Sequence, residues 1–179
     1  MYFLESERLG LRLLKETDLN GEYVDWFNDA VVCRYNSHHK FPMYRKNVED
    51  FIISLSNDES KIVLAVEEKD TKLHVGNISI QRIDFVSRQA EIAFMFGNVN
   101  SWGKGYATEA ARLMINHAFS ELGLQRLYFG TAENNMGMQR VGEKLGFKKA
   151  GTMRRAIYKN GKFLDIYSYD LLVEEWKSV

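Results

Sequence analysis

Cysteine and proline are almost absent from this sequence, and neither sign of charge is in excess. The single cysteine, Cys33, can form no intramolecular disulfide and no multi-thiolate zinc site, which points to a reducing compartment. Lysine plus arginine number 24, as do aspartate plus glutamate. Because no excess positive charge is present to displace counterions from a nucleic-acid backbone, we do not expect a dedicated DNA- or RNA-binding protein.

Long apolar runs are missing as well. Nowhere do 18 apolar residues follow one another, as a membrane-spanning helix requires. Glu5, Glu7 and Arg8 interrupt the stretch in which a secretory peptide would be apolar. The sequence therefore predicts a cytoplasmic protein with no membrane partner.

Nothing in the sequence divides the chain into parts. Its 179 residues are 45% hydrophobic, which is enough for one buried core. No internal repeat, low-complexity tract or proline-rich linker is present, and Pro42 lies in an irregular stretch. We expect a single domain over residues 1–179, either a monomer or a homodimer.

Hydrophobic periodicity predicts a mixed set of elements. Alternation predicts a strand over residues 9–13, a capped helix follows over 17–29, and a second helix covers 47–56. Branched and aromatic residues predict a three-strand meander over residues 62–66, 75–82 and 89–96.

The second half of the chain predicts a strand, helix, strand unit. Apolar residues recur at spacings of three and four in a long helix that begins at Gly103 and stops before Gly123. A strand (127–131), a short helix (136–145) and a hairpin (156–158 and 166–172, around the Asn160-Gly161 turn) come next. The order predicts a mixed α/β sheet whose parallel pair is 89–96 with 127–131.

The turn before the long helix is the most informative segment: Trp102-Gly103-Lys104-Gly105-Tyr106-Ala107. Glycines allow a tight turn in which successive N–H groups and the positive helix end converge on an anion such as phosphate. On these residues alone, a tight turn with no ligand remains the alternative. A P-loop needs Ser or Thr after Gly-Lys, and a dinucleotide fingerprint needs three glycines near the first strand, so neither fits.

This segment, extended as Gly103-Lys104-Gly105-Tyr106-Ala107-Thr108-Glu109-Ala110, resembles the acetyl-coenzyme A pyrophosphate loop of the GNAT N-acetyltransferases. Further segments resemble the family in the same order over almost the whole chain. Glu7-Arg8-Leu9 with Leu11-Arg12 is similar to the opening of the RimJ/RimL-like branch, which acetylates protein N-termini among other amines. Ala90-Glu91-Ile92 is similar to the central strand, and Asn135, Arg140-Val141 and Glu143-Lys144-Leu145-Gly146-Phe147 to the last helix.

The resemblance implies a GNAT-like α/β fold with acetyl-CoA as acetyl donor and no metal. Its central mixed, twisted sheet of about seven strands is flanked by helices, and a splayed parallel pair holds the cofactor. Backbone groups of Ala93, Phe94, Met95 and Phe96 are expected to pair with pantetheine. The implied pyrophosphate site comprises Trp102, Gly103, Lys104, Gly105, Tyr106, Ala107 and Thr108.

Two positions qualify this assignment. Trp102 stands where the family usually has Gln or Arg, so binding is expected from backbone N–H groups rather than from that side chain. The resemblance makes Asn135 a cofactor contact, although it is also suited to cap the following helix.

For catalysis, the resemblance implies direct attack of an amine on the thioester in a ternary complex. A backbone N–H of the central strand would stabilise the oxyanion. Glu91 is the candidate base, because an alkylamine with a pKa near ~10 is mostly protonated at neutral pH. The alternative for Glu91 is an ordinary salt-bridged or solvated glutamate.

The usual proton donors are missing. Many GNAT enzymes have tyrosine where this chain has Gly142, and the RimL-like serine position is Met138. A thiol has a pKa near ~8.5 and leaves tolerably as an anion, so water or a tyrosine such as Tyr106 or Tyr128 would suffice.

The acceptor side is the least constrained part of the sequence. Candidate contacts are Trp26, Tyr35, Asn36, His38 and Tyr158, and core packing is the alternative for the aromatic residues. His38 and His39 are adjacent and have no completing ligand, so we expect no metal site. The acceptor is a protein N-terminus or a small amine, with a nucleotide-linked amino sugar as an alternative. A non-catalytic acyl-CoA-binding module is the alternative of another class.

Overall fold

One eight-stranded sheet runs through the molecule in the order β1-β2-β3-β4-β5-β6-β8-β7. The structure, a computed structural model, describes residues 1–177. Every neighbouring pair is antiparallel except β5 and β6, which run parallel. The strands are β1 (Leu4–Glu5), β2 (Leu9–Leu13), β3 (Lys61–Glu68), β4 (His74–Asp84), β5 (Gln89–Met95), β6 (Arg126–Ala132), β7 (Lys148–Lys159) and β8 (Lys162–Leu172).

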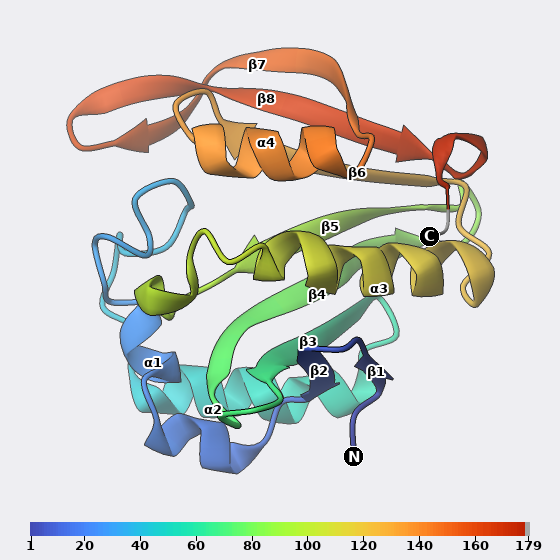
Figure 1. The fold of residues 1–179 in the computed structure, drawn as a ribbon. Coiled ribbons are helices and arrows are strands. Elements are labelled where there is room, and N and C mark those ends of the chain that lie inside the picture. The colour runs from blue at the N-terminus through green and yellow to red at the C-terminus, as the bar shows by residue number, and fades with distance from the viewer. Residues whose placement is uncertain (178–179) are drawn as a thin grey trace.

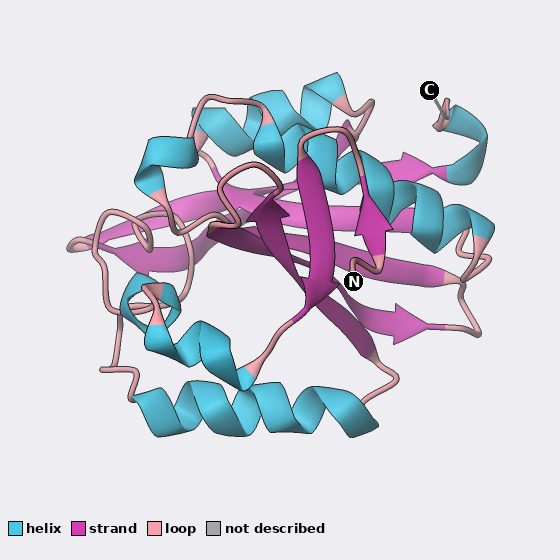
Figure 2. Ribbon diagram, turned by 60° about the horizontal axis from the view of Figure 1, so that its bottom comes forward, coloured by secondary structure: helices cyan, strands magenta, loops and turns pink. Residues whose placement is uncertain are grey.

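Helices cover both faces of the sheet (Figures 1 and 2). The long helix α3 (Tyr106–Ser120) and α4 (Met136–Lys144) lie on one face, and α1 (Tyr23–Trp26) and α2 (Arg45–Ser54) lie on the other. Short 3₁₀ turns complete the helical elements: η1 (Glu16–Asn20), η2 (Leu55–Asn57), η3 (Val99–Ser101) and η4 (Val173–Glu175). Among residues 1–177, no helix combines the length and the apolar character needed to cross a membrane.

Each face has its own hydrophobic core. On one face, α3 buries a stripe of apolar residues at spacings of three and four against the sheet, which is the pattern of an amphipathic helix: Ala110, Ala111, Met114, Ile115 and Ala118. The other core joins α1 and α2 to the sheet: Tyr23, Trp26, Phe27, Val48 and Ala65. The sheet is therefore the shared middle layer of a three-layer molecule.

The mixed α/β architecture and the parallel pair predicted from the sequence are confirmed. The hairpin turn is also where it was expected. Asn160 and Gly161 both have positive φ, and Lys159 pairs with Lys162, which is the geometry of a two-residue hairpin loop.

Some predicted boundaries are wrong. The long helix predicted to begin at Gly103 begins at Tyr106, because Gly103 and Gly105 have positive φ. The helix predicted over residues 17–29 is instead η1 followed by the four-residue α1, because Gly21 adopts an extended conformation between them. The hairpin strand predicted to begin at residue 156 begins at Lys148. This strand lies at the sheet edge with almost all its side chains exposed, so it lacks the apolar alternation that would have revealed it.

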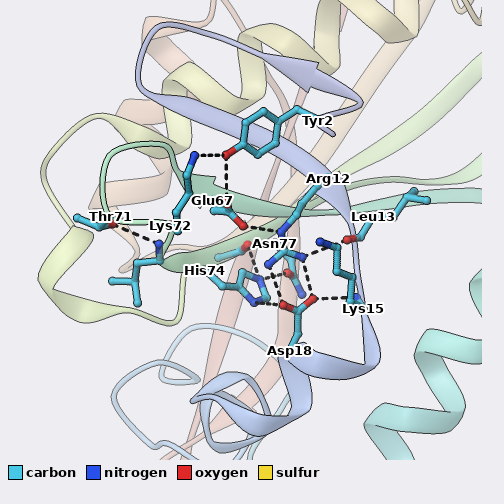
Figure 3. A network of polar contacts seen from close by, with 12 residues as sticks. Tyr2, Arg12, Leu13, Lys15, Asp18, Glu67, Thr71, Lys72, His74 and Asn77 are labelled. Carbon is cyan, nitrogen blue, oxygen red and sulfur yellow. Dashed lines mark hydrogen bonds and ion pairs between the residues drawn. The ribbon is translucent and has the colours of Figure 1, made fainter.

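A buried ion network joins β2, β3 and η1 (Figure 3). Arg12 on β2 is 7% exposed, and its guanidinium donates to both carboxylate oxygens of Asp18 at 2.9 and 2.8 Å. Its Nε donates to Glu67 on β3 at 2.6 Å. The Tyr2 hydroxyl donates to Glu67 at 2.8 Å. The network fixes η1 against the sheet.

The two carboxylates of this network are held ionised. Burial alone would raise the pKa of Asp18, but hydrogen bonds from Arg12 and from the Lys15 backbone outweigh it, so the pKa is lowered. The pKa of Glu67 is also lowered, because Arg12 and Tyr2 outweigh burial in the same way. Groups with lowered folded-state pKa values stabilise the fold above their unfolded values, about 4, and lose that contribution as pH falls through the folded values.

We expect Arg12→Met to lower the free energy of unfolding at pH 7 by about 3 to 5 kcal/mol, because two largely buried carboxylates lose their counter-ion. The deficit should shrink as pH falls, because the carboxylates protonate first in the variant and, at lower pH, in the wild type. Urea unfolding as a function of pH measures both effects. Lys46→Met removes two exposed ion pairs and is the matched control, with little change in the free energy of unfolding. A deficit below about 1 kcal/mol at pH 7 would contradict this role of Arg12.

Candidate active site

The parallel strands β5 and β6 separate soon after they begin to pair. Their register runs from Gln89↔Arg126 to Glu91↔Tyr128 and then ends, although β5 continues to Met95 and β6 to Ala132. The outer edges stay paired, β5 with β4 as far as Met95 and β6 with β8 as far as Ala132. The inner edges beyond Glu91 therefore bound a slot in the middle of the sheet.

A cavity of about 1040 Å³ occupies this slot and continues beneath α2. Its lining includes most of the cofactor and acceptor residues predicted from the sequence: Tyr35, Asn36, His38, Glu91, Ala93, Phe94, Met95, Phe96, Trp102, Gly103, Gly105, Tyr106, Ala107, Thr108 and Asn135. The tertiary fold thus brings segments separated by about a hundred residues to one concave surface, as expected of a small-molecule site.

The turn into α3 presents unoccupied backbone donors to the cavity. Gly103 and Gly105 have φ of +78° and +84°, a backbone conformation that residues other than glycine rarely adopt. Within the described chain, none of the N–H groups of residues 103–108 donates to a protein acceptor. Gly105 caps the helix without a side-chain bond. The arrangement suits an anion at the positive end of a helix.

The N-terminal segment braces this turn from outside. The Arg8 Nη1 donates to the Lys104 carbonyl at 3.2 Å, and its guanidinium forms an ion pair with Glu109 in the first turn of α3. It also lies 4.9 Å from the centre of the Tyr106 ring. Arg8 was known from the sequence only as part of a resemblance, because no local pattern indicates that residue 8 reaches residue 109.

Because successive side chains of a strand point to opposite faces, every second residue of β3, β4 and β5 points toward α2. The register pairs Asn77 with Met95, and Gln81 with Glu91. Glu91 has a side chain 21% exposed, and Gln81 donates to its Oε2 at 3.0 Å. The Arg82 Nε lies 3.5 Å from the same oxygen. Glu91 therefore stands at the point where the strands part, with its carboxylate at the cavity.

Three predicted site residues lie outside the cavity lining. Trp26 is 3% exposed and packs edge-on against Tyr23 and His74 in the core. Tyr158 is 52% exposed on the terminal hairpin, against the Phe163 ring. Lys104 directs its ammonium group toward the Tyr106 ring. The sequence alone does not distinguish an aromatic side chain packed in the core from one that contacts substrate, and two of these three residues are aromatic.

His38 lies in the loop before α2, among apolar neighbours. Its ring packs edge-on against Phe27 at a centroid distance of 5.1 Å, and burial lowers its pKa. Its carbonyl accepts a hydrogen bond from Lys159 at 2.6 Å. Cys33 in the same loop is buried, and its thiol donates to the Trp26 carbonyl at 3.1 Å. The described chain contains no cluster of three His, Cys, Asp or Glu side chains placed to hold a metal.

Comparison with known proteins agrees with this geometry. A family model described as an acetyltransferase (GNAT) domain matches residues 8–148. This chain belongs to the GNAT acetyltransferase family. Probable N-acetyltransferase YjcK of Bacillus subtilis (strain 168) is 30% identical, over 90% of this chain and 92% of the relative. Spermidine N(1)-acetyltransferase of Escherichia coli (strain K12) is 29% identical, over 86% and 80%. A crystal structure of a probable acetyltransferase superposes with a TM-score of 0.87 at 28% identity, over 97% and 99%.

The GNAT protein is therefore an acyltransferase that uses acetyl-CoA, and its residues fit that cofactor. The slot between β5 and β6 offers backbone groups without strand partners, and the turn before α3 offers free N–H donors. Arg140 and Lys144 on α4 add positive charge to the cavity lining. Asn135 caps α4 through its Oδ1, which accepts from the Met138 N–H at 3.3 Å, and it also lines the cavity.

The structure gives a steric reason for the missing GNAT tyrosine. A Cβ on Gly142 would lie 2.6 Å from Cζ of the Phe129 ring, so a side chain fits there only if that ring moves. The two other tyrosines considered from the sequence are no better placed. The Tyr106 hydroxyl donates to Glu68, and Tyr128 is not part of the cavity lining.

We expect Gly105→Ala to weaken CoA binding and to lower the free energy of unfolding by about 1 kcal/mol, because a Cβ strains the left-handed turn. The added Cβ meets nothing closer than the Arg8 Nη2 at 3.8 Å, so backbone strain rather than a clash causes the effect. Calorimetry with CoA and thermal unfolding measure the two changes. Gly151→Ala, whose Cβ also meets open space but without positive φ, is the control and should change neither. Equal behaviour of the two variants would show that this turn does not position the phosphate donors.

Proposed function

We propose that this protein transfers the acetyl group of acetyl-CoA directly to a primary amine, with Glu91 as the proton acceptor. The observation that carries the proposal is the position of Glu91, whose carboxylate lies at the cavity where β5 and β6 part. An ammonium group cannot attack a carbonyl carbon until it loses a proton. A carboxylate beside the reacting amine accepts that proton, either directly or through one water.

Each part of the cavity has a role in this proposal. Acetyl-CoA supplies an activated thioester carbonyl. The free N–H groups of residues 103–108 bind its diphosphate, and the unpaired edge of β5 beyond Glu91 binds its pantetheine amides. A backbone N–H on that edge stabilises the negative charge that develops on the carbonyl oxygen. The face of β3, β4 and β5 beneath α2 receives the amine.

The leaving thiolate requires no tyrosine in this proposal. Gly142 and Met138 occupy the positions of the usual donors, and neither carries an acidic proton. A thiol with a pKa near ~8.5 leaves as an anion at neutral pH, and water at the open cavity protonates it.

The resemblance and the relatives favour different acceptors. The opening segment Glu7-Arg8-Leu9 resembles the RimJ/RimL-like branch, which supports a protein N-terminus as acceptor. The spermidine acetyltransferase relative supports a small amine. Both acceptors are primary amines and require the same chemistry at Glu91.

We expect Glu91→Gln to lower kcat about 100-fold at pH 7, within the usual contribution of a general base. The loss should shrink toward pH 10, where the amine deprotonates without help. Release of free CoA as a function of pH measures this. Glu121→Gln, on the exposed end of α3, is the control with unchanged kinetics. Unchanged kcat in Glu91→Gln at pH 7 would remove this residue from the mechanism.

Calorimetry with acetyl-CoA, paired with turnover on a panel of primary amines, tests the function itself. We expect binding of acetyl-CoA and release of CoA that depends on the added amine. Binding without turnover on any amine would instead indicate an acyl-CoA-binding module. Failure to bind acetyl-CoA would contradict both interpretations.

A further inference from the structure

Apolar side chains alternate with neutral amides and hydroxyls, such as Asn47, Asn77 and Ser79, on the walls of the acceptor half of the cavity. Its floor is the face of β3, β4 and β5, and its cover is α2 with the loop before it. Members of the second hydrophobic core also line this half, so the core opens into the cavity rather than closing over it: Tyr23, Phe27, Val32, Val48, Phe51 and Val63. A ligand placed here contacts aliphatic and aromatic carbon on several sides.

Negative charge is scarce on the same surface. Glu91 is the one carboxylate among the residues that line the cavity in the described chain. Its Oε2 already accepts a hydrogen bond from Gln81 and lies 3.5 Å from the Arg82 Nε. One carboxylate can neutralise one ammonium group, which is that of the reacting amine.

Positive charge flanks the acceptor half instead. Lys61 is a lining residue, and its ammonium group is paired at 2.8 Å with Asp58, which lies outside the lining. Arg34 is also on the lining, with its guanidinium 4.9 Å from the Tyr35 ring centre and 5.1 Å from that of Trp102. No carboxylate of the described chain pairs with Arg34.

We infer that the acceptor is a primary amine on an apolar body without a second positive charge, and not a polyamine. This inference rests on the proposed function. The reacting amine faces Glu91, and the apolar body lies against Phe51, Val48 and Val63, where burial of carbon surface supplies the binding energy. A polyamine would bring one or more further ammonium groups to a surface that has no second carboxylate for them and that holds Lys61 and Arg34.

Two kinds of molecule carry a primary amine on an apolar body: a small aralkylamine, and a peptide whose N-terminal residue is large and apolar. The test measures kcat/KM at pH 8 for phenethylamine, for a tripeptide with N-terminal leucine and for spermidine, at saturating acetyl-CoA. We expect one or both apolar amines to exceed spermidine by at least about tenfold. The ratio between phenethylamine and the tripeptide distinguishes the two sources.

Variants of α2 locate the preference in the structure. Phe51→Ala should lower kcat/KM for the preferred apolar amine about tenfold, mainly through KM, and leave the KM for acetyl-CoA unchanged. Phe51→Leu keeps the apolar volume and should restore most of the loss, which separates contact with the amine from damage to the fold. Ile53→Ala, on the same helix but 61% exposed and outside the cavity lining, is the matched control with wild-type kinetics.

Two outcomes would overturn the inference and are distinguishable from each other. If spermidine has the highest kcat/KM of the three amines, the acceptor is a polyamine, and the proposed acetyl transfer still holds. If acetyl-CoA binds but no primary amine is acetylated, either among these three or in the wider panel, the proposed function fails and the inference fails with it. If Ile53→Ala raises the KM for the apolar amine as much as Phe51→Ala does, Phe51 does not belong to the acceptor wall.

Discussion

The site depends on one interruption in the sheet, the loss of pairing between β5 and β6 beyond Glu91. Backbone N–H and C=O groups in a protein interior need partners, so an open edge in the middle of a sheet is costly unless something binds there. Each strand keeps its outer neighbour, β4 or β8, and is therefore held in place while its inner edge stays free. A ligand with amides along its length completes both edges, which makes cofactor binding an extension of sheet formation.

The two faces of the sheet contribute different parts of the cavity lining. The face under α3 and α4 supplies the turn at residues 103–108 and the basic residues of α4, and the face under α1 and α2 supplies the acceptor walls. The acceptor floor is tied to the buried network in Figure 3 through His74, whose Nε2 lies 2.8 Å from the Asn77 Oδ1 and whose Nδ1 lies 3.8 Å from Asp18. Polar contacts of the buried network thus help to position Asn77 on the cavity floor.

The residues proposed to hold the cofactor could be named from the sequence because they lie in one continuous stretch that resembles a known family. The glycine turn at Gly103 and Gly105, the helix after it and Glu91 on the strand before it all belong to residues 91–120, and Glu91 and both glycines line the same cavity. The acceptor half was less predictable. Phe51 and Val63 belong to an ordinary helix and an ordinary strand, and they become cavity walls only because α2 lies across that face of the sheet.

From the sequence alone, the mixed α/β class, the parallel pair and the hairpin turn were predicted correctly, since each follows from periodicity or from glycine's freedom at positive φ. Anion binding at the turn before α3 stays a prediction. Only the tertiary structure decided where the parallel pair opens, that Arg8 braces the cofactor turn, that Trp26 belongs to the core, and that Glu91 is the only carboxylate on the described cavity lining. The physical reason is that burial, charge pairing and strand separation depend on residues far apart in the chain, and no local pattern records which of them meet.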